Sequence, residues 1–241
     1  MRCIGFFLSV IVLLSCSLSP TPKFKGIIIP LYVYPTSQEY SKIESLSFSK
    51  EVFVVLNPMN GPGVVRDDNY SKKILDLKLK GHKVLGYVYT SYGSRSIHDV
   101  TNDIKAWYIL YPNIDGIFFD EVSSRVVDLN YYSQCVSYVK KERISSKIVF
   151  NPGIFPETSD YFNLANIIVV AEMPQDQFLN EWTKSFEVSP NALCVLIYNV
   201  SDYESVFNKS VSENIGYIYI THEEFNNWRE VSKYISNLAS E

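Results

Sequence analysis

Two apolar segments of this 241-residue chain end in carboxylates. Residues 114–121 (IDGIFFDE) end in Asp120 and Glu121, and residues 167–172 (IIVVAE) end in Glu172. Apolar runs of this kind are typical of strands buried on both faces, so the acids lie where the strands leave the core. Paired carboxylates can cleave a glycosidic bond, because one protonates the leaving oxygen while the other attacks the anomeric carbon or activates water. We therefore predict these three acids as catalytic candidates.

Each acid also has a purely structural interpretation. Asp120 or Glu121 would then cap the following helix or pair with Arg125, and Glu172 would form a salt bridge at the rim. Successive strand side chains alternate, so Asp120 and Glu121 do not both point inward unless the chain is already leaving the pleat.

Polar and aromatic side chains near the other strand ends are candidates for substrate binding. The loop 57–63 (NPMNGPG) is punctuated by proline and glycine, which indicates a turn and favours a rigid rim loop. Aromatic rings offer flat apolar faces on which sugar rings stack. The predicted binding residues are Tyr34, Asn57, Asn60, Tyr89, Tyr92, Asn151, Tyr198 and His222. The histidines His82, His98 and His222 lack metal-ligand spacing, so we predict no metal site and no cofactor.

Eight apolar, β-branched and aromatic runs are separated by segments of mostly helical periodicity. The predicted strands are residues 26–34, 51–57, 83–90, 114–121, 147–151, 167–172, 193–199 and 216–222. The predicted helices are residues 71–80, 99–110, 131–143, 175–186, 202–211 and 223–238, with less clearly helical connections after the first and fifth strands.

Alternating strands and helices imply a parallel sheet, and eight units imply closure into a single-domain (β/α)₈ TIM barrel over residues 26–241. The alternative is an open doubly wound sheet. It is disfavoured because Pro30 and Pro35, rather than a glycine-rich phosphate loop, accompany the first strand's end. In such a barrel, catalytic residues lie at the carboxyl ends of the strands.

Composition restricts the function classes. The net charge of −4 and the lack of a basic stripe give nucleic-acid binding no support. The 18 Tyr, 14 Phe and 3 Trp residues serve mainly in the core, and some are expected to form sugar-stacking faces. We expect Cys135 and Cys194 to be buried and free, and the protein to be a monomer.

The N-terminus has the pattern of a targeting segment. Arg2 precedes an apolar run over residues 4–14, which is too short to span a bilayer comfortably. We predict a signal peptide or lipoprotein signal over residues 1–19 and a short linker over 20–25. Residues 13–16 (LLSC) are similar to a lipobox, in which Cys16 would carry a lipid anchor. The alternative is cleavage near residues 17–19. Either way the protein would be exported, as a secreted protein or an envelope lipoprotein.

Several motifs together resemble one family. They are VVLNPMNGPG (54–63), KVLGYVYTSYGSR (83–95), DI-x-x-W (103–107), YPNIDGIFFDE (111–121) and IVFNPG (148–153). In this order they resemble the spherulin-4-like family, with which glycoside hydrolases of galactosamine-containing polysaccharides are grouped.

The resemblance implies a (β/α)₈ barrel and endo-cleavage of α-1,4-linked galactosamine or N-acetylgalactosamine polymers. It places the family's adjacent acids at Asp120 and Glu121 and the later glutamate at Glu172. Asp120 is then the first choice for the charged catalytic carboxylate and Glu172 for the proton donor, with the role of Glu121 open. The alternatives are a non-catalytic glycan-binding or surface protein of the same family and, more weakly, a metal-dependent deacetylase-like enzyme. Retention or inversion at the anomeric carbon also stays open.

Overall fold

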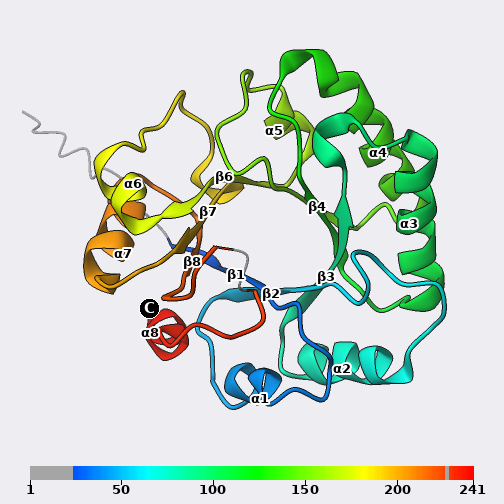
Figure 1. Cartoon of the computed structure of the whole chain (residues 1–241), viewed down its shortest axis with the longest axis horizontal. Coiled ribbons are helices and arrows are strands. Elements are labelled where there is room, and N and C mark those ends of the chain that lie inside the picture. The colour runs from blue at the N-terminus through cyan, green and yellow to red at the C-terminus, as the bar shows by residue number, and fades with distance from the viewer. Residues whose placement is uncertain (1–23, 226–227) are drawn as a thin grey trace, which may run out of the picture.

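The structure, a computed structural model, describes residues 24–225 and 228–241. The predicted signal segment, Cys16 and most of the predicted linker lie outside these residues. The described chain forms a closed barrel of parallel strands in sequence order, with helices around the outside (Figure 1). The strands are β1 (Gly26–Pro30), β2 (Glu51–Leu56), β3 (Lys83–Tyr89), β4 (Gly116–Asp120), β5 (Lys147–Phe150), β6 (Ile167–Pro174), β7 (Leu193–Tyr198) and β8 (Tyr217–Ile220). The TIM-barrel prediction is confirmed.

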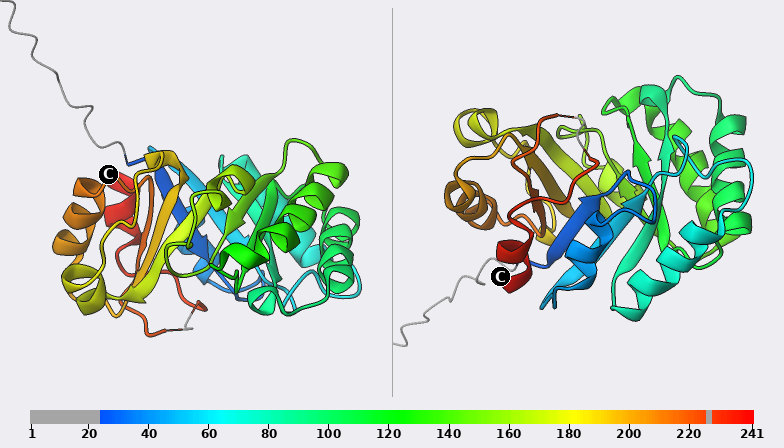
Figure 2. Two further views of the ribbon diagram at one scale, coloured as in Figure 1. Left: turned by 90° about the horizontal axis from the view of Figure 1, so that it is seen from above. Right: turned by 60° about the horizontal axis from the view of Figure 1, so that its bottom comes forward.

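Most helices lie close to their predicted positions. The helices are α1 (Glu39–Glu44), α2 (Asp68–Leu79), α3 (Ile97–Leu110), α4 (Leu129–Glu142), α5 (Tyr161–Leu164), α6 (Gln175–Asn180), α7 (Tyr203–Ser212) and α8 (Ile235–Ser240). The helices after β1 and β5 are short, at the two places where the sequence pattern was least clearly helical. Side views show the strands running obliquely through the ring of helices (Figure 2). No helix in the described ranges is long and apolar enough to cross a membrane.

The prediction of one long helix over residues 223–238 is wrong for most of its described part. Only Ile235–Ser240 is helical. Backbone groups before α8 bond to distant elements instead of to the next turn. The carbonyl of Trp228 accepts from the Tyr32 N–H at 2.7 Å, and the Val231 N–H donates to the Glu39 carboxylate at 2.6 Å. These long-range bonds replace the helical ladder and draw the segment towards β1 and α1.

The first predicted strand is also shorter than expected. It pairs with β2 only over Gly26–Pro30, so Tyr34 lies four residues past the strand end. Few residues close the barrel between β1 and β8, because these two strands share the single register pair Gly26 and Tyr217.

Strands buried on both faces make the core continuous. The outward face of β3 shows how closely a helix packs on it. A Cβ atom at Gly86 would lie 2.5 Å from the ring of Trp107, whose indole N–H donates to the Tyr87 carbonyl at 2.8 Å. Cys135 and Cys194 are buried and free, as predicted.

Strand β6 contains a β-bulge. Its pairing with β7 shifts between Val169 and Ala171, which leaves Val170 as the extra residue. A bulge re-aims the side chains that follow it and is common beside active sites. Glu172 is the second residue after this bulge, so the irregularity helps to decide where its carboxylate points.

Candidate active site

A cavity of about 660 Å³ opens at the carboxyl ends of the strands. All three candidate acids line it. The lining residues are Tyr32, Asn57, Asn60, Tyr87, Tyr92, Asp120, Glu121, Asn151, Pro152, Gly153, Ile154, Glu172, Phe225 and Trp228. The volume falls within the range typical of small-molecule sites. These residues lie at the ends of seven of the eight strands or in the segments that follow them, as the barrel architecture predicts.

Asn151 joins two of the acids. Its side-chain N–H₂ donates to Asp120 Oδ1 at 2.8 Å and to Glu172 Oε2 at 2.6 Å. The lengths of the two bonds limit the separation of these oxygens to about 5.4 Å. With an angle of roughly 120° between the two donated bonds, the separation is about 4.7 Å. The pair is therefore close to the spacing of about 5–5.5 Å found between the carboxyl groups of retaining glycosidases.

The asparagine is itself fixed by its surroundings. It is 5% exposed, and its Oδ1 accepts the backbone N–H of Gly153 at 3.0 Å. Its backbone N–H donates to the Phe119 carbonyl at 2.8 Å, and its carbonyl accepts from Val122 at 3.0 Å. Strand β5 thus locks the amide directly beside the end of β4.

The two bridged acids have different electrostatic surroundings. Burial and, secondarily, the charge of Asp120 raise the pKa of Glu172 to about 7, against the lowering effect of the Asn151 hydrogen bond. Burial also raises the pKa of Asp120, but hydrogen bonds from the Tyr87 hydroxyl, the Glu121 N–H and Asn151 oppose this rise. Asp120 has more donors that stabilise its anion. The arrangement therefore favours a charged Asp120 beside a Glu172 that still holds its proton near neutral pH.

Glu121 has an unusual backbone. Its φ of 50° lies in the left-handed region, which costs a non-glycine residue free energy. The Glu121 carbonyl accepts from the Thr90 hydroxyl at 2.7 Å and from the Tyr92 N–H at 2.6 Å. These bonds hold the conformation that brings Glu121 into the cavity directly after inward-facing Asp120. The alternation of a regular strand does not continue here, so both adjacent acids face the same cavity.

Four of the eight predicted binding residues line the cavity, namely Asn57, Asn60, Tyr92 and Asn151. Tyr92 is 61% exposed and has a left-handed backbone, as has Asn60. The Asn57 side chain accepts the Gly61 N–H at 2.9 Å, so it also shapes the loop that carries Asn60.

The other four lie outside the cavity lining. Tyr34 donates to Asp67 at the start of α2 at 2.9 Å. Tyr89 lies under the Arg95 guanidinium, 4.1 Å from ring centre to carbon. Tyr198 stacks obliquely on Phe225, with ring centres 5.3 Å apart, and so supports a residue of the lining.

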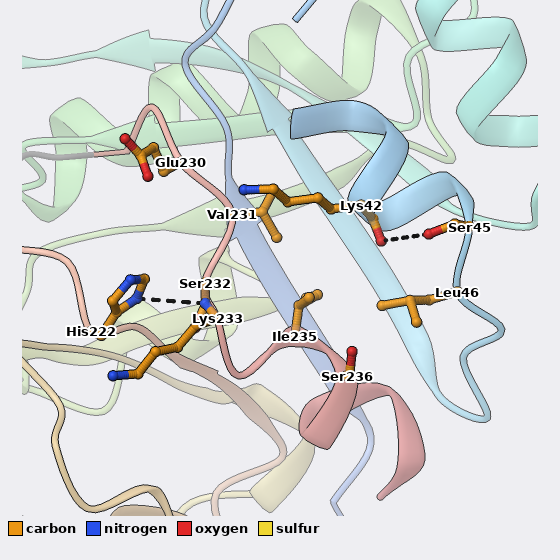
Figure 3. A pocket seen from close by; sticks show the side chains of 10 residues that line it. All are labelled: Lys42, Ser45, Leu46, His222, Glu230, Val231, Ser232, Lys233, Ile235 and Ser236. Atoms are coloured by element: carbon orange, nitrogen blue, oxygen red, sulfur yellow. Dashed lines mark hydrogen bonds between the residues drawn. The ribbon is translucent and has the colours of Figure 1, made fainter. Parts of the chain in front are cut away.

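His222 lies beside a separate groove between α1 and the segment leading to α8 (Figure 3). Its Nε2 pairs with Glu223 at 2.9 Å, and its Nδ1 faces the Lys233 N–H at 3.5 Å. The imidazole is thereby engaged at the barrel rim, away from the three acids.

Four aromatic lining residues, Tyr32, Tyr87, Phe225 and Trp228, are not among the predicted binding residues. Tyr87 shares a face of β3 with Tyr89, and this period of two was the available signal. Tyr32 packs edge-on against Tyr87 at 5.4 Å. Phe225 and Trp228 belong to the segment predicted as a helix, so no sequence pattern placed them at the mouth.

No group of three or more His, Cys, Asp or Glu side chains in the described ranges is arranged to hold a metal ion. The two bridged carboxyl groups are sufficient by themselves for acid–base and nucleophilic attack on a glycosidic bond.

Comparison with known proteins identifies the family to which this barrel belongs. The model of the spherulation-specific family 4 (Spherulin4) matches residues 26–241. The chain belongs to the spherulin-4 family. Spherulin-4 of Physarum polycephalum is 29% identical over 167 residues, 69% of this chain. The chain spans about half the length of that relative, because the match covers 50% of it.

Among solved structures, Sph3 of Aspergillus clavatus, crystallised with GalNAc, superposes with a TM-score of 0.77 at 27% identity. The match covers 91% of this chain and 97% of Sph3. A β-mannanase from Streptomyces thermolilacinus matches in fold alone, with a TM-score of 0.51 at 12% identity over 82% of this chain and 78% of the enzyme. This member of the spherulin-4 family therefore has an Sph3-like barrel fold, which the β-mannanase shares.

Proposed function

We propose that the protein is a glycoside hydrolase that cleaves polysaccharides containing galactosamine or N-acetylgalactosamine, by endo-attack on α-1,4 linkages. The observation that carries the proposal is the Asp120–Asn151–Glu172 bridge, which holds two carboxyl groups at catalytic spacing in a cavity at the barrel mouth. The GalNAc bound to the related Sph3 supports an amino-sugar substrate. The linkage and the endo mode rest on the family resemblance.

In this proposal Glu172 is the acid and Asp120 the nucleophile. Glu172, with its pKa raised to about 7, protonates the departing glycosidic oxygen. The Asp120 carboxylate attacks the anomeric carbon from the opposite side and forms a covalent glycosyl-enzyme. Glu172, now ionised, activates the water that releases the product. The short oxygen separation leaves too little space for a water between acid and base, so the geometry favours retention of configuration.

Glu121 is assigned to substrate binding beside the pair. No described residue donates a hydrogen bond to its carboxylate, which lines the cavity together with Tyr92 and Asn60. A carboxylate in this position can accept hydrogen bonds from sugar hydroxyl or amino groups.

The experiment is a reducing-sugar assay on an α-1,4-galactosamine polymer, with mass analysis of the products. Asp120→Asn and Glu172→Gln should each lower kcat by at least about 10³-fold, because each removes a group that acts on the reacting bond. Glu121→Gln should act mainly on KM. Glu204→Gln, on an exposed residue of α7, is the matched control and should leave hydrolysis unchanged.

Hydrolysis that persists in both Asp120→Asn and Glu172→Gln would show that the site assignment is wrong. Wild-type protein that retains the polymer without releasing product would select the non-catalytic glycan-binding alternative.

Export stays a proposal that rests on the apolar run at residues 4–14, and secreted and lipid-anchored forms differ in whether Cys16 carries a lipid. Mass analysis of the mature N-terminus distinguishes them.

A further inference from the structure

A second groove lies on the other side of the loop that follows β5. It has a volume of about 350 Å³ and is lined by residues of this loop, of β6 and of α6 with the segment after it. Ile154 lines both this groove and the catalytic cavity, and it is 52% exposed. The two hollows therefore meet at one exposed side chain, and a bound chain can pass from one to the other over Ile154.

The β6 bulge creates the floor of this groove. In a regular strand Val170 and Glu172 would share a face, since side chains alternate. Here Glu172 lines the catalytic cavity, whereas Val170 lines the outer groove. The Val170 carbonyl accepts the Trp182 indole N–H at 3.1 Å, which fixes the ring against the strand. The bulge thus directs the Glu172 carboxyl group into the catalytic cavity and places Val170 in the outer groove.

The floor is rigid. The Lys209 ammonium donates to the carbonyls of Phe178, Leu179 and Trp182 at 2.7, 3.1 and 3.0 Å. These bonds satisfy carbonyls at the end of the short helix α6 and hold the Trp182 segment in place. The Phe155 ring lies 6.0 Å from Trp182 with an angle of 30° between the ring planes. A ligand that binds here pays little to order the site.

The chemistry of the groove suits a sugar chain. Its floor is apolar, with Met173 and Trp182 almost buried. Its rim is polar and exposed, formed by Gln177, Glu181 and Ser185 among others. Sugars present apolar faces and polar edges, which match such a floor and rim. Neither hollow has a Lys, Arg or His among its described lining residues, and together they hold four carboxyl groups. An uncharged or cationic chain is therefore favoured over an anionic one.

We propose that this groove is a distal subsite, in which the polysaccharide binds beyond Ile154 while another part of the same chain occupies the catalytic cavity. The inference rests on the proposed function for the identity of the chain, and it explains how a polymer would be preferred over its short fragments.

The test is to fill the groove and compare substrates of different length. Ser185→Trp places a large ring at the exposed rim without altering the core. Ser236→Trp is the matched control, because exposed Ser236 lines the separate groove of about 360 Å³ beside α1 in Figure 3, which shares no lining residue with the catalytic cavity. We expect Ser185→Trp to lower kcat/KM on an α-1,4-galactosamine polymer about tenfold, and to change hydrolysis of the corresponding trisaccharide less than twofold. The control should change neither.

An equal loss on polymer and trisaccharide, or no loss on either, would overturn the distal subsite. Retention of the folded proteins in gels that contain the polymer tests the same inference without hydrolysis. In a Glu172→Gln background, Ser185→Trp should be retained less than Ser236→Trp, and equal retention would contradict the proposal. If wild-type protein hydrolyses nothing but this difference persists, the proposed function fails while the subsite stands.

Discussion

The acid proposed for catalysis should destabilise the fold, and Glu172→Gln should reveal by how much. The surroundings of Glu172 raise its pKa from 4.5 to about 7, mainly through burial and then through the charge of Asp120. This difference corresponds to about 3 kcal/mol in favour of the protonated form. A raised carboxyl pKa means that the folded state binds the proton more tightly than the unfolded state. Stability is therefore lost as pH rises from about 4.5 to 7.

A glutamine cannot ionise, yet its carbonyl oxygen can still accept the hydrogen bond from Asn151. Glu172→Gln should match the wild type in stability near pH 4. It should become more stable by up to about 3 kcal/mol at pH 8, while hydrolysis is lost. Urea unfolding at several pH values between 4 and 8.5 measures this difference. Exposed Glu204→Gln serves as the control and should show no such rise above pH 5.

A stability difference that does not change with pH would refute the reasoning, because it would show that Glu172 titrates alike in the folded and unfolded chains. A loss of stability at pH 8 would refute it more strongly. It would mean that the charged form is favoured in the fold and that Glu172 is a poor proton donor at neutral pH.

Four further predictions concern the site and the barrel that carries it. The kcat/KM of the wild type should fall above a pH of about 7, as Glu172 loses its proton in the free enzyme, and a pH profile of kcat/KM with a flat alkaline limb would contradict the assignment. Asn151→Ala should lower kcat about 100-fold and move the alkaline limb to higher pH, because the lost hydrogen bond had lowered the pKa of Glu172. The lower pKa of Glu172 expected in Asp120→Asn can be followed by carboxyl NMR of the inactive protein. Gly86→Ala should cost roughly 1–3 kcal/mol in thermal unfolding, since the new methyl group would overlap the Trp107 ring.

The pattern of the barrel could be predicted because each unit obeys a local rule. The buried runs are strands since every residue from Val52 to Leu56 must be apolar to pack on both faces. Predicted and observed strands agree to within a few residues, and the largest overrun is at Tyr34. Polar strand ends then indicate the mouth, because all parallel strands end at the same edge.

The segment before α8 shows where local rules fail. Its periodicity favoured a helix, but the backbone of Trp228 and Val231 binds Tyr32 and Glu39, which are nearly 200 residues away in sequence. The helix propensity of a segment is only a weak preference, and tertiary hydrogen bonds override it here. Phe225 and Trp228 reach the cavity only through this arrangement, so no pattern in the sequence could place them there.

The sequence alone determined the strand order, the strand ends and the identity of the three acids, because these depend on composition and period. The tertiary structure decided which groups meet. Asn151 lies 31 residues from Asp120 and 21 from Glu172, and only the adjacency of β4, β5 and β6 places one amide between both acids. The bulge at Val170 and the left-handed backbone of Glu121 set the final directions of the side chains. These features depend on packing against partners distant in sequence, and the raised pKa of Glu172 follows from that packing.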